Sequence, residues 1–128
     1  MKALKILFAD DDLKYSMLLK RFLEKEGYEV TYAGNGKIAL EQFPLIKPDL
    51  VLLDINMPGY NGFEVAEYLA SHGRNVPVIL VSGRKRAAEL FATSNNIKFF
   101  LSKPYNKDML GRAIRDVLDK DISWPRSS

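Results

Sequence analysis

The segment Leu50-Val51-Leu52-Leu53-Asp54 places four consecutive aliphatic residues directly before an aspartate. No polar residue interrupts the apolar run, which is typical of a strand that is buried on both faces of a parallel sheet. Val78–Val81 repeats the pattern before Ser82. Two such strands favour a sheet that is covered by helices on both sides.

Three further apolar runs of similar length complete a set of five expected strands. They are Leu4–Ala9, Glu29–Ala33 and Lys98–Leu101. The segments between the strands have helical spacing, and the clearest has a stripe expected to face the core, formed by Tyr15, Leu18, Leu19, Phe22 and Leu23. The other expected helices are Gly36–Phe43, one between Asn61 and Gly73, Arg84–Ser94, and one after Asn106 that carries Leu110, Ile114, Val117 and Leu118. This alternation predicts an α/β fold of the doubly wound (βα)₅ type with right-handed crossovers, although it does not determine the strand order.

The composition limits the classes of protein that fit. The chain has 128 residues, no cysteine, one histidine (His72) and a net charge of +3. These counts exclude disulfide frameworks, thiolate zinc sites and clusters of several histidines. We expect one domain over residues 1–120 and a tail or linker over 121–128. The absence of an 18-residue apolar span favours a soluble cytoplasmic protein that does not bind membranes. The net charge of +3 is too small to indicate nucleic-acid binding, which we do not expect.

Polar side chains follow four of the five expected strands. Asp10-Asp11-Asp12 follows the first, Asp54 the third, Ser82 the fourth, and Ser102-Lys103-Pro104 the fifth. Ligands of open α/β sheets bind outside the carboxyl ends of the strands. The sequence therefore predicts one site at that edge of the sheet.

The aspartates point to a metal ion. We interpret Asp12 as the N-cap of the first helix. If the third strand lies beside the first, Asp10, Asp11 and Asp54 share a pocket, where like charges ~4 Å apart repel by ~4 kcal/mol at an effective dielectric near ~20. Such a cluster requires raised pKa values or a cation, and ligands that are all oxygen favour Mg²⁺.

The remaining side chains of this edge suit a phosphoryl group. The Lys103 ammonium can bind a carboxylate or phosphate oxygens. The Ser82 hydroxyl can donate to a phosphate oxygen, although a strand-end serine before Gly83 is equally typical of a turn. Asp54 is the better candidate nucleophile because it stands alone on its strand, and carboxylates can form aspartyl phosphates.

These segments together resemble the receiver domain of bacterial response regulators over about residues 3–120. The resemblance is carried by Ile6–Asp12, by Leu52–Gly59 with Gly62, by Val81-Ser82-Gly83, and by Leu101-Ser102-Lys103-Pro104-Tyr105. It implies the flavodoxin-like strand order 2-1-3-4-5, in which the first strand lies beside the third. It also implies a cis peptide bond at Lys103-Pro104.

The resemblance further implies a signalling role. Asp54 would accept a phosphoryl group from a sensor histidine kinase or a histidine phosphotransfer protein. Asp11, Asp54 and the Asn56 carbonyl would hold Mg²⁺, with Asp10 assisting through water. Ser82 and Lys103 would bind the phosphoryl oxygens. Such a domain is not an enzyme acting on a separate substrate, since it catalyses its own phosphorylation and dephosphorylation.

A switch and an output face are also implied by the resemblance. Ser82 would move towards the phosphoryl group, and Phe100 would turn into the vacated space. Phe100 stands where the family more often has tyrosine. The fourth helix, fifth strand and fifth helix would form the surface for a downstream effector.

Three alternatives remain open on the sequence alone. A phosphatase of the haloacid dehalogenase type would use the first-strand motif Asp10-Asp11-Asp12 for its nucleophile. A flavodoxin-like module would bind a cofactor, although no glycine-rich phosphate loop follows the first strand. A pseudo-receiver would only bind a partner.

Overall fold

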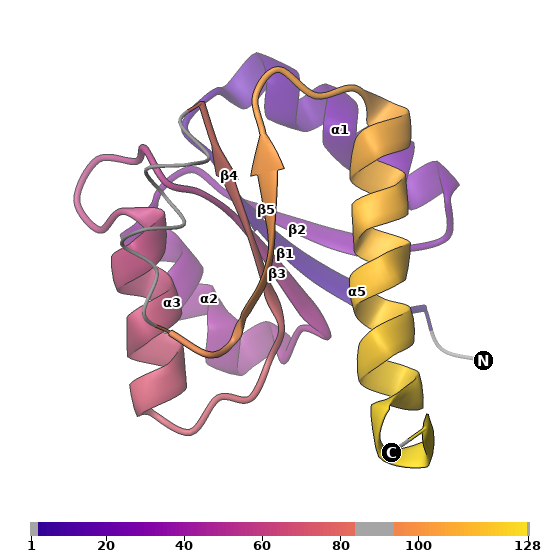
Figure 1. Cartoon of the computed structure of the whole chain (residues 1–128). Helices are drawn as coiled ribbons and strands as arrows, with labels where there is room; N and C mark the ends of the chain where they lie inside the picture. Colours follow the sequence, from indigo (N-terminus) through magenta and orange to yellow (C-terminus); the bar gives the residue numbers. More distant parts are fainter. Residues whose placement is uncertain (1–2, 84–93, 128) are drawn as a thin grey trace.

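The computed structural model describes residues 3–83 and 94–127, and within them it forms a three-layered α/β fold (Figure 1). The strands are β1 (Lys5–Ala9), β2 (Glu29–Ala33), β3 (Leu50–Asp54), β4 (Val78–Ser82) and β5 (Ile97–Ser102). The described helices are α1 (Leu13–Lys25), α2 (Gly36–Ile46), α3 (Gly62–Ser71) and α5 (Lys107–Ser127). All neighbouring strands are parallel and the order is β2-β1-β3-β4-β5, which confirms the expected fold class.

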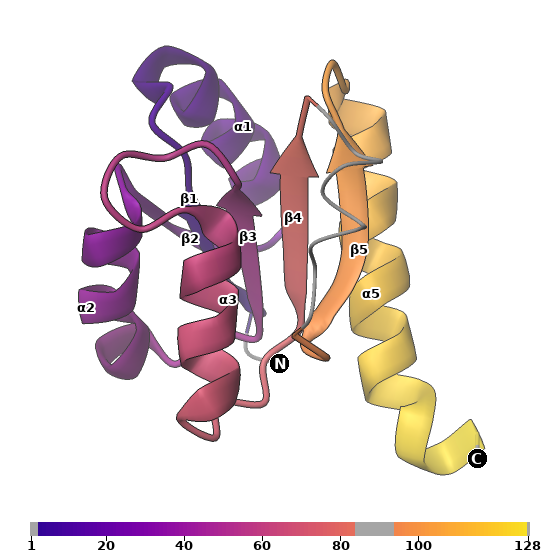
Figure 2. The same cartoon turned by 60° about the vertical axis from the view of Figure 1, so that its left-hand side comes forward.

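The continuous apolar strands are buried because helices cover both faces of the sheet. In β3, Leu50 and Leu52 belong to the core beneath α1 and α5, whereas Val51 and Leu53 belong to the core beneath α2 and α3. Figure 2 shows α2 and α3 on one side of the sheet and α5 on the other. Every residue of β3 is buried, as the absence of polar alternation predicted.

The core-facing stripe of α1 differs from the expected one at Leu18. This side chain is 63% exposed, whereas Ser16 is fully buried together with Leu19 and Leu23. Residues 16, 19 and 23 follow the spacing i, i+3 and i+7, and Leu18 lies ~100° around the helix from Leu19. The prediction for Leu18 was wrong, because an apolar side chain can remain exposed when its position on the helix faces away from the core.

The C-terminal helix extends further than the sequence pattern predicted. The helix α5 continues to Ser127, so the stretch from Ile122, expected to lose its periodicity, is helical as far as Ser127. A further helix was expected at Arg84–Ser94. All of this range except Ser94 lies outside the described residues. Within the part of the chain that the structure describes, none of the helices combines the length and apolar character needed to cross a membrane.

Gly36 at the start of α2 is expected to be intolerant of a larger side chain. A Cβ atom there would lie 2.4 Å from the Tyr60 carbonyl oxygen and 3.0 Å from a methyl carbon of Val65. We therefore expect Gly36→Ala to lower the free energy of unfolding by ~2–3 kcal/mol, measured by urea denaturation. Gly83→Ala is the matched control, because a Cβ there meets nothing within 4 Å. Equal urea midpoints for the two variants would contradict this expectation.

Candidate functional site

Three carboxylates meet at the carboxyl ends of β1 and β3. Ala9 pairs with Leu53 in the parallel register, so Asp10 directly after β1 and Asp54 at the end of β3 become neighbours. Asp10 is 1% and Asp54 is 2% exposed, whereas Asp11 is exposed. One carboxylate oxygen from each of the three residues lies within 4.8 Å of the others. The arrangement confirms that these acidic residues share one pocket.

Lys103 is paired with one of these carboxylates. Its Nζ atom donates to Oδ2 of Asp54 at 2.8 Å, and its backbone N–H donates to the carbonyl oxygen of Ser82 at 2.8 Å. Partial burial on its own lowers the pKa of Lys103, but the hydrogen bond and charge of Asp54 outweigh this effect and raise that pKa above its usual value. The Lys103-Pro104 peptide bond is cis, as the resemblance implied.

Backbone N–H groups orient the two buried carboxylates. The N–H of Asp12 donates to Oδ1 of Asp10 at 2.9 Å, and the N–H of Asn56 donates to Oδ1 of Asp54 at 3.1 Å. Asp54 therefore uses its two oxygens for different partners, a backbone amide and the Lys103 ammonium. Charge-assisted hydrogen bonds of this kind hold a carboxylate in one orientation.

Asp12 does not join the three-carboxylate cluster. Its Oδ1 atom accepts the backbone N–H of Tyr15 at 3.2 Å, which caps α1. This contact confirms the interpretation of Asp12 as an N-cap. The loop after β1 therefore divides its three consecutive aspartates between a structural role and the site.

Burial raises the pKa of Asp10 to about 6 from its usual value of 3.8. The Asp12 amide and the charge of Lys103 oppose this shift, and the charges of Asp54 and Asp11 add to it. An acid with a raised pKa in the folded protein favours its protonated form there. Its contribution to stability is therefore complete below pH 3.8 and is lost as the pH rises through about 6.

We expect Asp10→Asn to stabilise the protein in metal-free buffer at pH 8. The gain should be on the order of 2 kcal/mol, because the variant removes a buried charge and keeps an acceptor for the Asp12 amide. The gain should shrink as the pH falls from about 6 towards 4. Urea denaturation in the presence of EDTA at several pH values measures it.

The control is Asp12→Asn, which removes the same charge from an exposed side chain and keeps a good helix cap. It should change the free energy of unfolding by less than ~0.5 kcal/mol at each pH. A pH-independent effect of Asp10→Asn, or a loss of stability at pH 8, would contradict the assigned role of the buried charge.

The other expected site residues lie around this cluster. Ser82 is buried at the end of β4, one residue beyond Val81, which is the register partner of Asp54. Asn56 contacts Asp54 through its backbone, and its side chain is exposed. Phe100 is half-buried against the core beneath α2 and α3. The fourth helix of the expected effector face lies outside the described residues.

The second strand also contributes to the site, a feature that the sequence pattern did not predict. The Tyr32 hydroxyl donates to the backbone carbonyl oxygen of Asp10, and its ring packs edge-on against Phe8 at 6.1 Å between centroids. Tyr32 therefore holds the acidic loop from the β2 side. The sequence signal that could have indicated this contact is the position of Tyr32, a hydroxyl-bearing residue near the end of β2, which lies beside β1.

The model of the response regulator receiver domain family matches residues 6–115 of this chain. The chain belongs to this family. It is a receiver domain of two-component response regulators, and its pocket of Asp10, Asp11 and Asp54 fits a phosphoryl acceptor site. Both the recognition drawn from the sequence and the expected fold are thereby confirmed.

Solved structures and curated relatives agree with this assignment. The receiver domain is 34% identical to the response regulator TrrA from Thermotoga maritima, solved in complex with Mg²⁺-BeF, with a TM-score of 0.80 over 91% of this chain and 99% of that one. It is 32% identical to the chemotaxis protein CheY of Thermotoga maritima over 88% of this chain and 96% of that protein.

Other relatives are longer than this chain. The receiver domain is 33% identical to the transcriptional regulatory protein YxdJ of Bacillus subtilis over 89% of its own length, but it covers only 50% of YxdJ. The chain thus spans about half the length of several curated relatives that it matches.

Proposed function

We propose that this receiver domain accepts a phosphoryl group from a phosphohistidine onto Asp54 in a Mg²⁺-dependent reaction. The observation that carries the proposal is the environment of Asp54. This carboxylate is buried, lies within a cluster of three acids, and is held by the Lys103 ammonium and the Asn56 amide. Such a carboxylate is fixed in orientation and is paired with a cation that can also bind phosphoryl oxygens.

The donor set fits Mg²⁺. The cluster offers only oxygen ligands, and burial raises the pKa of Asp10 because its charged form is poorly solvated there, with the charges of Asp54 and Asp11 adding to the shift. We assign Asp11, Asp54 and the Asn56 carbonyl as ligands, with Asp10 acting through water. When bound, Mg²⁺ neutralises charge on the carboxylates and the phosphoryl oxygens.

The transfer requires one bond to form and one to break. An Asp54 carboxylate oxygen attacks the phosphorus atom, the P–N bond breaks, and the imidazole of the donor leaves with the bonding electrons. Lys103 and Ser82 bind the phosphoryl oxygens. Dephosphorylation returns the carboxylate by attack of water at phosphorus. Since these residues belong to the domain, it catalyses both steps on itself.

The phosphoryl group would act through Ser82 and Phe100. Ser82 moves to donate to a phosphoryl oxygen, and Phe100 turns further into the core. The surface that changes is the fourth helix, β5 and α5, which binds a downstream effector.

We assign residues 1–120 to the phosphoacceptor domain and 121–128 to a tail or linker. The phosphodonor is a sensor histidine kinase or a histidine phosphotransfer protein, and the location is cytoplasmic.

The test is incubation with acetyl phosphate, with and without Mg²⁺, followed by intact mass measurement and peptide mapping. We expect one phosphoryl adduct that forms only with Mg²⁺ and maps to Asp54. An adduct on Asp10 would favour the dehalogenase-like alternative, in which the nucleophile follows the first strand. No adduct under any condition would favour a pseudo-receiver. Either result would overturn the proposal.

A further inference from the structure

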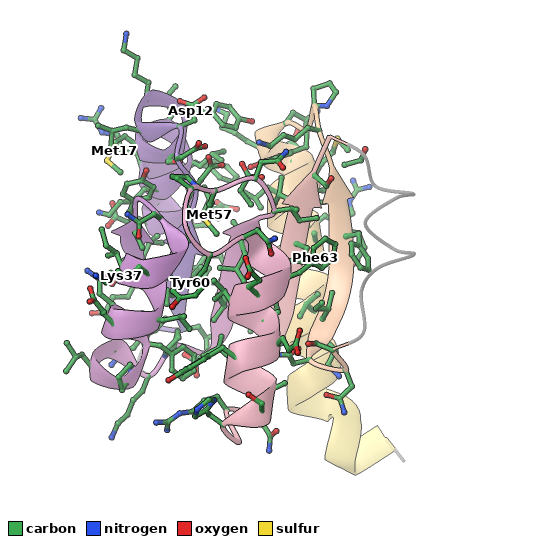
Figure 3. All side chains as sticks on the ribbon, turned by 90° about the vertical axis from the view of Figure 1, so that its left-hand side faces the viewer. Asp12, Met17, Lys37, Met57, Tyr60 and Phe63 are labelled. Atoms are coloured by element: carbon green, nitrogen blue, oxygen red, sulfur yellow. The ribbon has the colours of Figure 1, made fainter. Side chains whose placement is uncertain are left out.

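A groove between α2 and α3 lies outside the residues assigned to phosphoryl transfer. Its volume is about 320 Å³, near the lower end for sites that bind ligands. It is lined by Leu40, Tyr60, Glu64, Glu67, Tyr68 and Ser71. Figure 3 looks onto this face, where Tyr60 lies between the two helices. The groove thus combines one aliphatic, two aromatic, two acidic and one hydroxyl-bearing side chain.

The lining has an acidic character that contrasts with the rest of the chain. The protein has a net charge of +3, yet none of the six lining residues is basic and the sequence of α3 contains no lysine or arginine. Lys37, the basic residue of α2, points to the outer side of that helix in Figure 3. The groove therefore attracts a cation.

Two of the lining side chains are held in place before any partner binds. Glu64 accepts the Asn61 backbone N–H at 2.9 Å in the capping box of α3. The Tyr68 ring stacks on His72 with 3.9 Å between centroids. Preorganised groups lose little conformational freedom on binding, which favours affinity.

The aromatic residues favour a guanidinium among cations. Tyr60 and Tyr68 are each 48% exposed, and arginine packs on aromatic faces while its planar group pairs with carboxylates. A contact of this kind already joins α2 to the segment that follows α3, since the Arg74 guanidinium carbon lies 5.9 Å from the centroid of the Phe43 ring. Leu40 offers an apolar wall for a neighbouring aliphatic side chain.

We propose that the α2–α3 groove docks a segment of a partner protein that presents an arginine next to an aliphatic residue. The carboxylates of Glu64 and Glu67 pair with the guanidinium, the tyrosine rings pack against it, and Leu40 contacts the aliphatic neighbour. This docking does not depend on phosphorylation of Asp54, so the two proposals fail separately.

The test is an NMR titration of the ¹⁵N-labelled full chain with the peptide acetyl-Ala-Leu-Arg-Leu-Ala-amide. We expect saturable amide shifts centred on the six lining residues. The matched peptide with glutamate in place of arginine should bind at least about fivefold more weakly. Absence of saturation up to ~10 mM peptide would overturn the proposal, since it excludes even a weak specific site.

Two charge reversals separate groove binding from general attraction to an acidic surface. Glu67→Lys places a cation in the groove and should lower the affinity for the arginine peptide by about tenfold. Glu41→Lys makes the same change at an exposed α2 position outside the lining and should change its affinity less than about twofold. Equal weakening by both variants would overturn the proposal.

Self-association of the chain supplies the last check. Sedimentation velocity of the free protein should show a monomer, because no second copy is needed to fill the groove. A dimer that Glu67→Lys dissociates and Glu41→Lys leaves intact would assign the groove to a second copy of this chain and would overturn the partner-segment proposal.

Discussion

Replacing Asp54 by asparagine is expected to abolish the phosphoryl adduct formed with acetyl phosphate and Mg²⁺. The amide keeps the shape of the carboxylate and its acceptor for the Asn56 N–H, but it lacks the nucleophilic oxygen and the negative charge that Lys103 contacts at 2.8 Å. The initial rate of adduct formation, followed by intact mass, should fall by more than ~10³-fold.

The matched control is Asp49→Asn just before the opposite end of β3. The Asp49 carboxylate accepts the backbone N–H of Lys5 at 2.7 Å and is exposed. It lies five residues before Asp54 in the sequence, beyond the other end of β3, so the variant should form the adduct at the wild-type rate. If Asp54→Asn still formed an adduct with the same yield, Asp54 would not be the acceptor.

Replacing Lys103 by methionine should have the second-largest effect. Asp54 is 2% exposed and would lose the only ammonium that the described residues bring within 4 Å of it. The transferred phosphoryl group would also lose a cation at its oxygens. Removal of one such charged donor typically lowers a rate by ~10²–10³-fold, and we expect adduct formation to slow by about this factor.

Lys98→Met is the control for this variant. Lys98 lies on β5, the strand that Lys103 directly follows. It is exposed and donates to the Asn95 carbonyl oxygen at 3.1 Å rather than to the site. Its replacement should leave the rate within about twofold of wild type. Circular dichroism and urea midpoints would show that both variants fold. A Lys103→Met protein that is folded and reacts at the wild-type rate would exclude Lys103 from phosphoryl binding.

The position of the site was predictable because strand direction is a local property. A continuous apolar run marks a buried strand, and the residue that follows it must emerge at the carboxyl edge. Asp54 and Lys103 lie 49 residues apart in the chain. Asp54 is the last residue of β3, and Lys103 directly follows β5. The sequence pattern therefore predicts that both lie at one edge of the sheet.

The contact between Lys103 and Asp54 could not be predicted from the pattern of strands alone. The alternation of strands and helices leaves several strand orders possible, and only the resemblance supplied the order 2-1-3-4-5. The division of three adjacent aspartates between a helix cap and the site likewise depends on loop geometry. The roles of Ser82, Asn56 and Phe100 stay predictions.

The amino-acid sequence by itself determined the five strands, the edge that collects the polar groups and the chemical nature of those groups, because burial and strand direction are encoded within short segments. Only the tertiary structure decided that Ser16 rather than Leu18 faces the core, that Tyr32 reaches the Asp10 carbonyl, and that α2 and α3 enclose an acidic groove. These features arise from the way distant segments pack against one another. The spacing of residues within one segment does not specify which other segment will pack against it.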